Sequence, residues 1–94
     1  MPGKFHVLAP PGFQRDVRRL TARNPDLGDA VEELIEILEE DPHNQTGKYN
    51  IKKLVGVKPG DGQWRIRLGN YRLRYDIVGT DVVLDSFRDR KDAY

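Results

Sequence analysis

Apolar and polar residues alternate strictly between Trp64 and Tyr75, on both sides of the pair Gly69-Asn70. The apolar residues at every second position are Trp64, Ile66, Leu68, Tyr71, Leu73 and Tyr75. This period is typical of strands with one buried face, and Gly-Asn is a common two-residue hairpin loop. The pattern therefore predicts a β-hairpin with these cross-strand pairs: Leu68 with Tyr71, Arg67 with Arg72, Ile66 with Leu73, Arg65 with Arg74, and Trp64 with Tyr75.

Four arginines occupy the other face of this hairpin: Arg65, Arg67, Arg72 and Arg74. Two arginines roughly 5 Å apart in a wet environment repel each other by about 1 kcal/mol unless an acid or a ligand relieves them. Arginines on an exposed strand face can also serve only to keep the chain soluble and to discourage edge pairing. A solubilising face normally mixes both signs of charge, however, so the cluster favours a polyanionic ligand.

A third strand is predicted after the turn at Gly79-Thr80, because the following residues are rich in β-formers. We expect Val82, Leu84 and Ser86 to face the core. In this register Asp85 lies opposite Arg74 and neutralises it, whereas a shift by one residue would bury the carboxylate. Asp76 partly neutralises the positive charge at the nearby end of this face. The excess positive charge then rests on Arg65, Arg67 and Arg72.

Two helices are predicted before the hairpin. The first covers 13–23, with apolar residues at i, i+4 and i+7. The second starts with Asn24 as N-cap and Pro25 as the first helical residue, and it runs to about Asp41. Its apolar stripe consists of Leu27, Ala30, Val31, Leu34, Ile35 and Leu38. Its acidic outer face has no metal-ligand spacing and is interpreted as a solvated surface.

The remaining segments complete an α+β fold. We expect a strand at 5–8, a strand or irregular extended segment at 48–55 and a loop at 56–62. The predicted order is β-α-α-β-β-β, an antiparallel sheet with a helical hairpin packed on one face. Residues 1–94 form a single domain, since no repeat or linker divides them. The arginines lie on the face that the helices leave open.

Composition narrows the chemistry. The 94 residues contain no cysteine and a single serine, Ser86, which excludes disulfides and thiolate chemistry and gives no sign of a serine nucleophile. His6 and His43 have no acidic cluster at ligand spacing, so we expect no metal and no cofactor. No apolar run is long enough for a membrane span and no export signal is evident, which favours a cytoplasmic protein.

The formal net charge of +1 hides an uneven distribution. Residues 1–41 carry 5 Lys or Arg against 9 Asp or Glu, whereas 42–94 carry 11 against 6. A nucleic-acid binder can gather its positive charge on one face in this way.

Arginines and lysines alone can hold a phosphodiester and stabilise the charge of a pentavalent transition state. RNA supplies its own nucleophile, the 2′-hydroxyl, and an aromatic side chain can hold an unstacked base. The candidates for this chemistry are Arg65, Arg67, Arg72, Arg88 or Arg90, and Tyr94. The proton acceptor is not evident from the sequence.

The chain resembles the RelE/ParE toxin superfamily of bacterial and archaeal toxin-antitoxin systems. The resemblance rests on "EEDP" at the end of the second helix, "IKKLVG" before the loop, "WRIRLGNYRLRYDI" in the hairpin and "RDRKDAY" at the end. Similarity to the RelE branch implies a RelE-like microbial ribonuclease fold and a toxin that cleaves mRNA on the ribosome without metal, by 2′-hydroxyl attack. It also implies a cognate antitoxin, with the ribosome and mRNA as further partners.

Matched positions assign roles by this resemblance. Arg65, Arg67 and Arg72 would contact the scissile phosphate, Arg88 or Arg90 would act at the leaving group, and Tyr94 would stack on a base. Lys52, Lys53 and Arg74 are expected to bind RNA. Some relatives have lysines where this chain has Arg65 and Arg67, and arginine almost never loses its proton, so no general base is assigned. Two alternatives stay open: a ParE-like toxin that inhibits DNA gyrase by protein contact, and an inactive binding partner.

Overall fold

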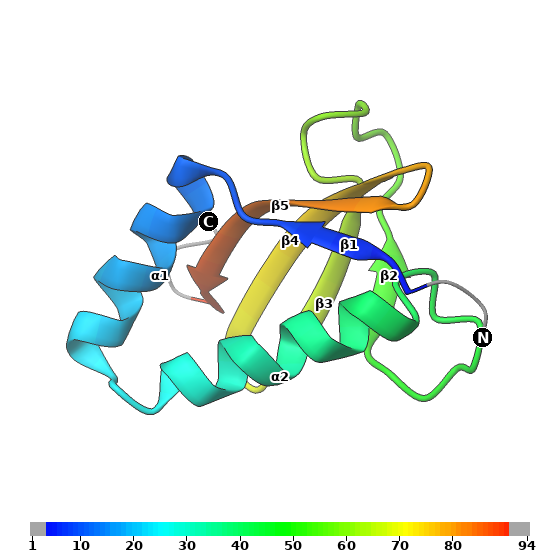
Figure 1. Ribbon diagram of the computed structural model, residues 1–94. Coiled ribbons are helices and arrows are strands. Elements are labelled where there is room, and N and C mark those ends of the chain that lie inside the picture. Colours follow the sequence, from blue (N-terminus) through cyan, green and yellow to red (C-terminus); the bar gives the residue numbers. More distant parts are fainter. Residues whose placement is uncertain (1–3, 91–94) are drawn as a thin grey trace.

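Five strands form one sheet in the order β1-β5-β4-β3-β2, and two helices pack against it (Figure 1). The computed structural model describes residues 4–90. Its elements are β1 (His6–Leu8), α1 (Pro11–Arg23), α2 (Leu27–Glu40), β2 (Ile51–Lys53), β3 (Trp64–Leu68), β4 (Tyr71–Val78) and β5 (Asp81–Asp89). The α+β class is confirmed. The sheet is mixed, because β1 pairs parallel with β5 while β2 to β5 are antiparallel.

The predicted hairpin is confirmed in every pair. β3 and β4 join Trp64 to Tyr75, Arg65 to Arg74, Ile66 to Leu73, Arg67 to Arg72, and Leu68 to Tyr71. Gly69 in the loop has φ +57°, the left-handed conformation that glycine adopts most readily. The loop chemistry and the alternating pattern therefore set the register together.

A β-bulge separates β5 from its predicted register. Tyr75 pairs with Leu84 as expected, but Arg74 pairs with Ser86 and Leu73 with Phe87, so Asp85 is the extra residue. The turn at Gly79-Thr80 and the burial of Val82 and Leu84 are confirmed. The placement of Ser86 in the core was wrong. The bulge instead buries the much larger apolar side chain of Phe87, which is 0% exposed.

The boundary between the two helices also differs from the prediction. Asn24 is the C-cap of α1, where its N–H donates to the carbonyl of Leu20, and α2 begins only at Leu27. The assignment of Asn24 as the N-cap was wrong, because α1 continues to Arg23 and Asn24 ends that helix, which leaves Asp26 as the N-cap of α2. Pro25 and Asp26 form a turn instead, in which the N–H of Leu27 donates to the carbonyl of Asn24.

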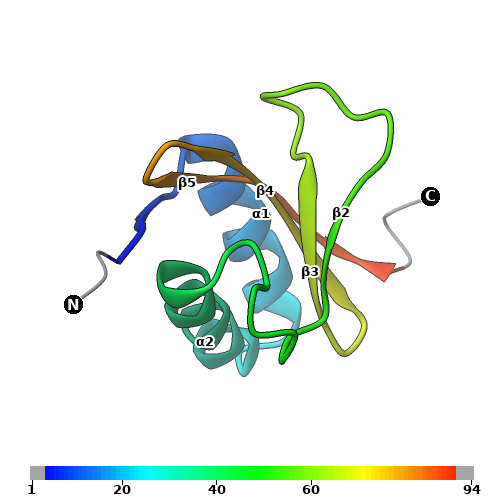
Figure 2. The same ribbon diagram turned by 90° about the vertical axis from the view of Figure 1, so that its right-hand side faces the viewer.

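The hydrophobic core lies between the helices and one face of the sheet. Both helices lie on the same side of β2 and β3, and no helix covers the other side within residues 4–90 (Figure 2). The buried apolar residues are Phe13, Leu20, Leu27, Val31, Leu34, Leu38, Ile66, Leu73, Tyr75, Val82, Leu84 and Phe87. Neither α1 nor α2 has the length and apolar character needed to span a membrane, a result that covers the described residues only.

Asp41 organises the loop that follows α2. Its carboxylate accepts hydrogen bonds from the N–H groups of Gln45 and Thr46 and from the hydroxyl of Thr46. Burial alone would raise the pKa of Asp41, but these hydrogen bonds outweigh it and hold the pKa below the ordinary value of 3.8. The loop is also fixed from the core side, where the hydroxyl of Tyr75 donates to the carbonyl of Pro42.

The variant Asp41→Asn is expected to lower the free energy of unfolding by about 1 to 3 kcal/mol at neutral pH, because an amide cannot accept all three hydrogen bonds. A carboxyl whose pKa is depressed by folding stabilises the protein only while ionised, so the difference should shrink as the pH falls through 3.8 and below. Urea unfolding near neutrality and at about pH 3 measures this. Asp29→Asn, on the exposed face of α2, is the control, and a pH-independent difference would contradict the assignment.

Candidate nucleic-acid interface

Three arginines form a row across three neighbouring strands. Arg72 in β4 pairs with Arg67 in β3 on one side and with Arg88 in β5 on the other. Adjacent strands lie about 4.8 Å apart, so the three residues are side by side. They share the face opposite the helices, because the residues that alternate with them, Ile66, Leu73 and Phe87, are in the core. We call Arg67, Arg72 and Arg88 the arginine row.

A second line of residues runs beside the arginine row on the same face. Lys52 pairs with Arg65, Arg65 with Arg74, and Arg74 with Ser86. The next residue along β2, Lys53, lies on the opposite face, with Nζ 5.7 Å from the centre of the Trp64 ring. The structure therefore brings Lys52 to the predicted cationic face and separates Lys53 from it.

Arg74 holds the loop that precedes β3. Its Nε donates to the carbonyl of Gly62 at 3.0 Å and its Nη2 to the carbonyl of Asp61 at 2.8 Å. The carboxylate of Asp76 also holds this loop, because it accepts hydrogen bonds from the backbone N–H groups of Gly62 and Gln63. Gly62 has φ +78°, and a Cβ at this position would lie 2.9 Å from the Cβ of Arg74. The guanidinium of Arg74 is therefore engaged within the molecule.

Asp85 lies next to this contact. Loss of hydration raises the pKa of the Asp85 carboxyl, the nearby Arg74 lowers it in part, and repulsion from Asp76 and Asp61 raises it further. The expected compensation between Asp85 and Arg74 is thus present electrostatically. The positive charge of Arg74 is consequently offset in part by acids of the same molecule.

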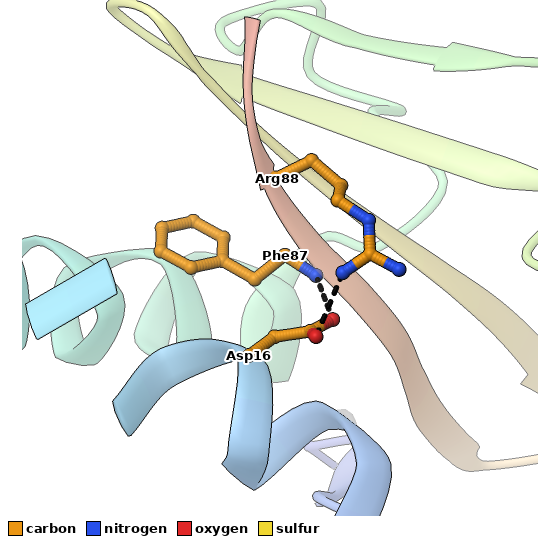
Figure 3. A network of polar contacts seen from close by, with 3 residues as sticks. All are labelled: Asp16, Phe87 and Arg88. Atoms are coloured by element: carbon orange, nitrogen blue, oxygen red, sulfur yellow. Dashed lines mark hydrogen bonds and ion pairs between the residues drawn. The ribbon is translucent and has the colours of Figure 1, made fainter. Parts of the chain in front are cut away.

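Asp16 of α1 fixes Arg88 (Figure 3). Its Oδ1 lies 2.7 Å from Nη1 of Arg88, and its Oδ2 accepts the backbone N–H of Phe87 at 3.0 Å. β1 pairs only with residues 81–83 of β5, so α1 rather than a strand supplies the partner for this N–H group. Asp16 was not among the candidate residues predicted from the sequence. The available signal was its position as the single acid within the arginine-rich helix α1.

The structure places Arg90 differently from Arg88. Arg90 follows β5, is exposed, and donates its backbone N–H to the carbonyl of Asn70 in the turn between β3 and β4. Arg88 stands in the arginine row. Tyr94, the predicted stacking residue, lies outside the described residues.

The two histidines are engaged away from the arginine row. The ring of His43 packs edge-on against Trp64, 5.4 Å between centres, and also contacts Phe5. Nδ1 of His6 lies 3.6 Å from a carboxylate oxygen of Asp81. Residues 4–90 contain no group of three or more histidine or acidic side chains arranged to hold a metal ion. The arrangement on this face is therefore one of guanidinium groups, suited to binding phosphate oxygens.

Comparisons with known proteins agree with this fold. The family model described as the ParE toxin of the type II toxin-antitoxin system parDE matches residues 7–94. The fold resembles that in the RelB-RelE antitoxin-toxin complex from Methanococcus jannaschii, with 24% identity, coverage of 94% of this chain and 95% of that chain, and a TM-score of 0.68. It also resembles that in the toxin-antitoxin complex RelBE2 from Mycobacterium tuberculosis, with 27% identity, coverage of 93% and 99%, and a TM-score of 0.69. No curated protein matches the sequence.

The fold and the match over nearly the whole chain define a toxin of a type II toxin-antitoxin system. The chain belongs to the ParE toxin family, within the RelE/ParE superfamily that its motifs resemble.

Proposed function

We propose that this toxin is an endoribonuclease that cleaves mRNA on the ribosome, without a metal, by attack of the 2′-hydroxyl on the neighbouring phosphate. The observation that carries the proposal is the arginine row, because Arg67, Arg72 and Arg88 pair across three neighbouring strands on a face that no described helix covers. The preorganised charge of this row suits the negative charge that develops on a phosphorus with five oxygen ligands.

The row suggests a division of roles. In this reaction the 2′-oxygen bonds to phosphorus, the bond from phosphorus to the 5′-oxygen breaks, and the products are a 2′,3′-cyclic phosphate and a 5′-hydroxyl. Arg72, in the middle, is suited to hold a non-bridging phosphate oxygen together with Arg67. Arg88, oriented by Asp16, is suited to stabilise the departing 5′-oxygen. Arginine keeps its proton, so both the acceptor of the 2′-hydroxyl proton and the donor of the proton that the 5′-oxygen takes up lie outside the row.

The partners follow from the same proposal. Both similar structures are described as complexes of a toxin with an antitoxin, which supports a cognate antitoxin for this chain as well. An antitoxin that covers the arginine row would block RNA. The ribosome and mRNA are the proposed targets, and such targets require a cytoplasmic setting. Arg65, Lys52, Arg90 and Tyr94 stay candidate RNA contacts.

Inhibition of DNA gyrase is the second candidate, and the observation that favours it is the match to the ParE model. A gyrase inhibitor acts through protein contact and needs no alignment of guanidinium groups around one phosphate. The arginine row therefore favours the ribonuclease.

Mapping of mRNA 5′ ends in a translation extract tests the proposal. The wild-type toxin should produce new 5′-hydroxyl ends inside translated codons, and the double variant Arg67→Ala, Arg72→Ala should not. Arg18→Ala, an exposed arginine of α1 outside the row, is the matched control and should retain cleavage. Intact mRNA together with inhibited supercoiling by purified gyrase would overturn the proposal in favour of the second candidate.

A further inference from the structure

An open groove of about 410 Å³ lies between α1 and β5, beyond the end of the arginine row. Its lining residues are Gly12, Arg15, Asp16, Arg19, Asp85 and Arg88. Three of them are cationic and two are acidic. Asp16 and Arg88 pair with each other, and Asp16 also accepts the backbone N–H of Phe87. The remaining charges of the groove are those of Arg15 and Arg19 against the single acid Asp85, which leaves it net positive.

Arg15 and Arg19 are one helical turn apart, so they extend from the same face of α1 towards the groove. The first turn of α1 contains no acidic residue, and its N-cap Pro10 makes no side-chain capping hydrogen bond. The positive end of the helix dipole near Gly12 therefore adds to the charge of the arginines.

Arg88 connects this groove to the arginine row, because it belongs to both. A polyanion that crosses β3, β4 and β5 along the row reaches the edge of the sheet at Arg88 and next meets Arg15 and Arg19. None of these α1 arginines takes part in the proposed cleavage chemistry.

We propose that the groove is a second phosphate site, which binds a backbone phosphate of the same single-stranded RNA whose scissile phosphate lies on the arginine row. The inference rests on the proposed function and extends it from one phosphate site to a continuous RNA track, which consists of the arginine row followed by Arg15 and Arg19. The track runs over the sheet edge onto α1. Arg15 and Arg19 are its binding residues, and they contribute to affinity rather than to bond cleavage.

Binding to an RNA that cannot be cut tests the second site without depending on catalysis. The probe is a fluorescent 2′-O-methyl oligonucleotide of about nine nucleotides, measured by anisotropy at several salt concentrations. The double variant Arg15→Gln, Arg19→Gln should bind roughly tenfold more weakly at low salt, and its salt slope should fall by about 0.7 for each phosphate that the protein no longer neutralises.

The matched control is Arg18→Gln, Arg23→Gln, which removes the same charge from the same helix at exposed positions outside the groove. It should change affinity much less. An equal decrease in affinity in both double variants would show that only net charge matters, and this would overturn the proposal. Wild-type affinity in the Arg15→Gln, Arg19→Gln variant would also overturn it.

Amide resonances locate the site. Titration with the oligonucleotide should shift the Gly12 resonance, because Gly12 lines the groove. Resonance shifts confined to β3 and β4 would overturn the second site. A Gly12 shift with a hexaglutamate peptide but not with the oligonucleotide would also overturn it, and would assign the groove to an acidic protein partner. RNA binding at Gly12 by a toxin that cuts no mRNA would support the groove while refuting the ribonuclease.

Discussion

Replacement of Arg72 by alanine is expected to reduce the rate of mRNA cleavage by roughly 10²- to 10³-fold, the usual decrease when one preorganised donor to a developing charge is removed. Arg72 has an arginine on each side in the sheet, so a phosphate on the row lies closest to the middle guanidinium. The variant should remain folded, because Arg72 lies on the face opposite the helices and is not among the buried core residues. Cleavage of ribosome-bound mRNA and urea unfolding of the same preparations measure the two effects.

Arg74→Ala is the matched comparison, since it lies two residues away on the same strand and the same face. Arg74 donates hydrogen bonds to the carbonyls of Gly62 and Asp61, so its removal should destabilise the protein more than the removal of Arg72 does. Its effect on cleavage should be smaller. If Arg72→Ala cleaved mRNA at the wild-type rate, the row would have no role at the scissile phosphate.

Replacement of Phe87 by alanine is expected to destabilise the fold by about 3 to 5 kcal/mol. The side chain is fully buried and packs against the rings of Phe13 and Tyr71. A small domain has a total stability of only about 5 to 15 kcal/mol, so the variant would be largely unfolded at moderate urea concentrations. Urea unfolding followed by circular dichroism measures the change.

Ser86→Ala provides the comparison and tests the bulge at Asp85. Ser86 faces the cationic side in the observed register and hydrogen-bonds the carboxyl of Asp85, so the substitution should cost no more than about 1.5 kcal/mol, well below the effect of Phe87→Ala. In the register without a bulge, Ser86 would be in the core and Phe87 exposed. A large destabilisation by Ser86→Ala with a small one by Phe87→Ala would therefore restore the unbulged register.

The sequence was sufficient for the hairpin because two independent signals agree there. Strict alternation specifies the buried face, and Gly69-Asn70 specifies the loop, so every pair between β3 and β4 follows. The register of β5 was not predictable in the same way, because the strand does not keep an unbroken period of two. One inserted residue, Asp85, moves every later side chain to the other face, and alternation contains no signal for it.

The candidate site was predictable where it depends on strand register and hidden where it depends on tertiary contacts. The row of Arg67 and Arg72 follows from the hairpin. The participation of Arg88 in the row depends on the bulge, and its orientation depends on Asp16, which lies far earlier in the chain. The engagement of Arg74 by Gly62 depends on the path of a loop. The parallel pairing of the short strand β1 likewise leaves no periodic signature.

The double contact made by Asp16 links two properties that could otherwise vary separately. One carboxylate closes the open edge of the sheet at Phe87 and also orients a cationic side chain on the outer face. A substitution there would release a strand edge that invites self-association and would at the same time misalign Arg88. Selection for solubility and selection for toxicity would therefore act on the same carboxylate, that of Asp16. Few substitutions at this position of α1 would satisfy both.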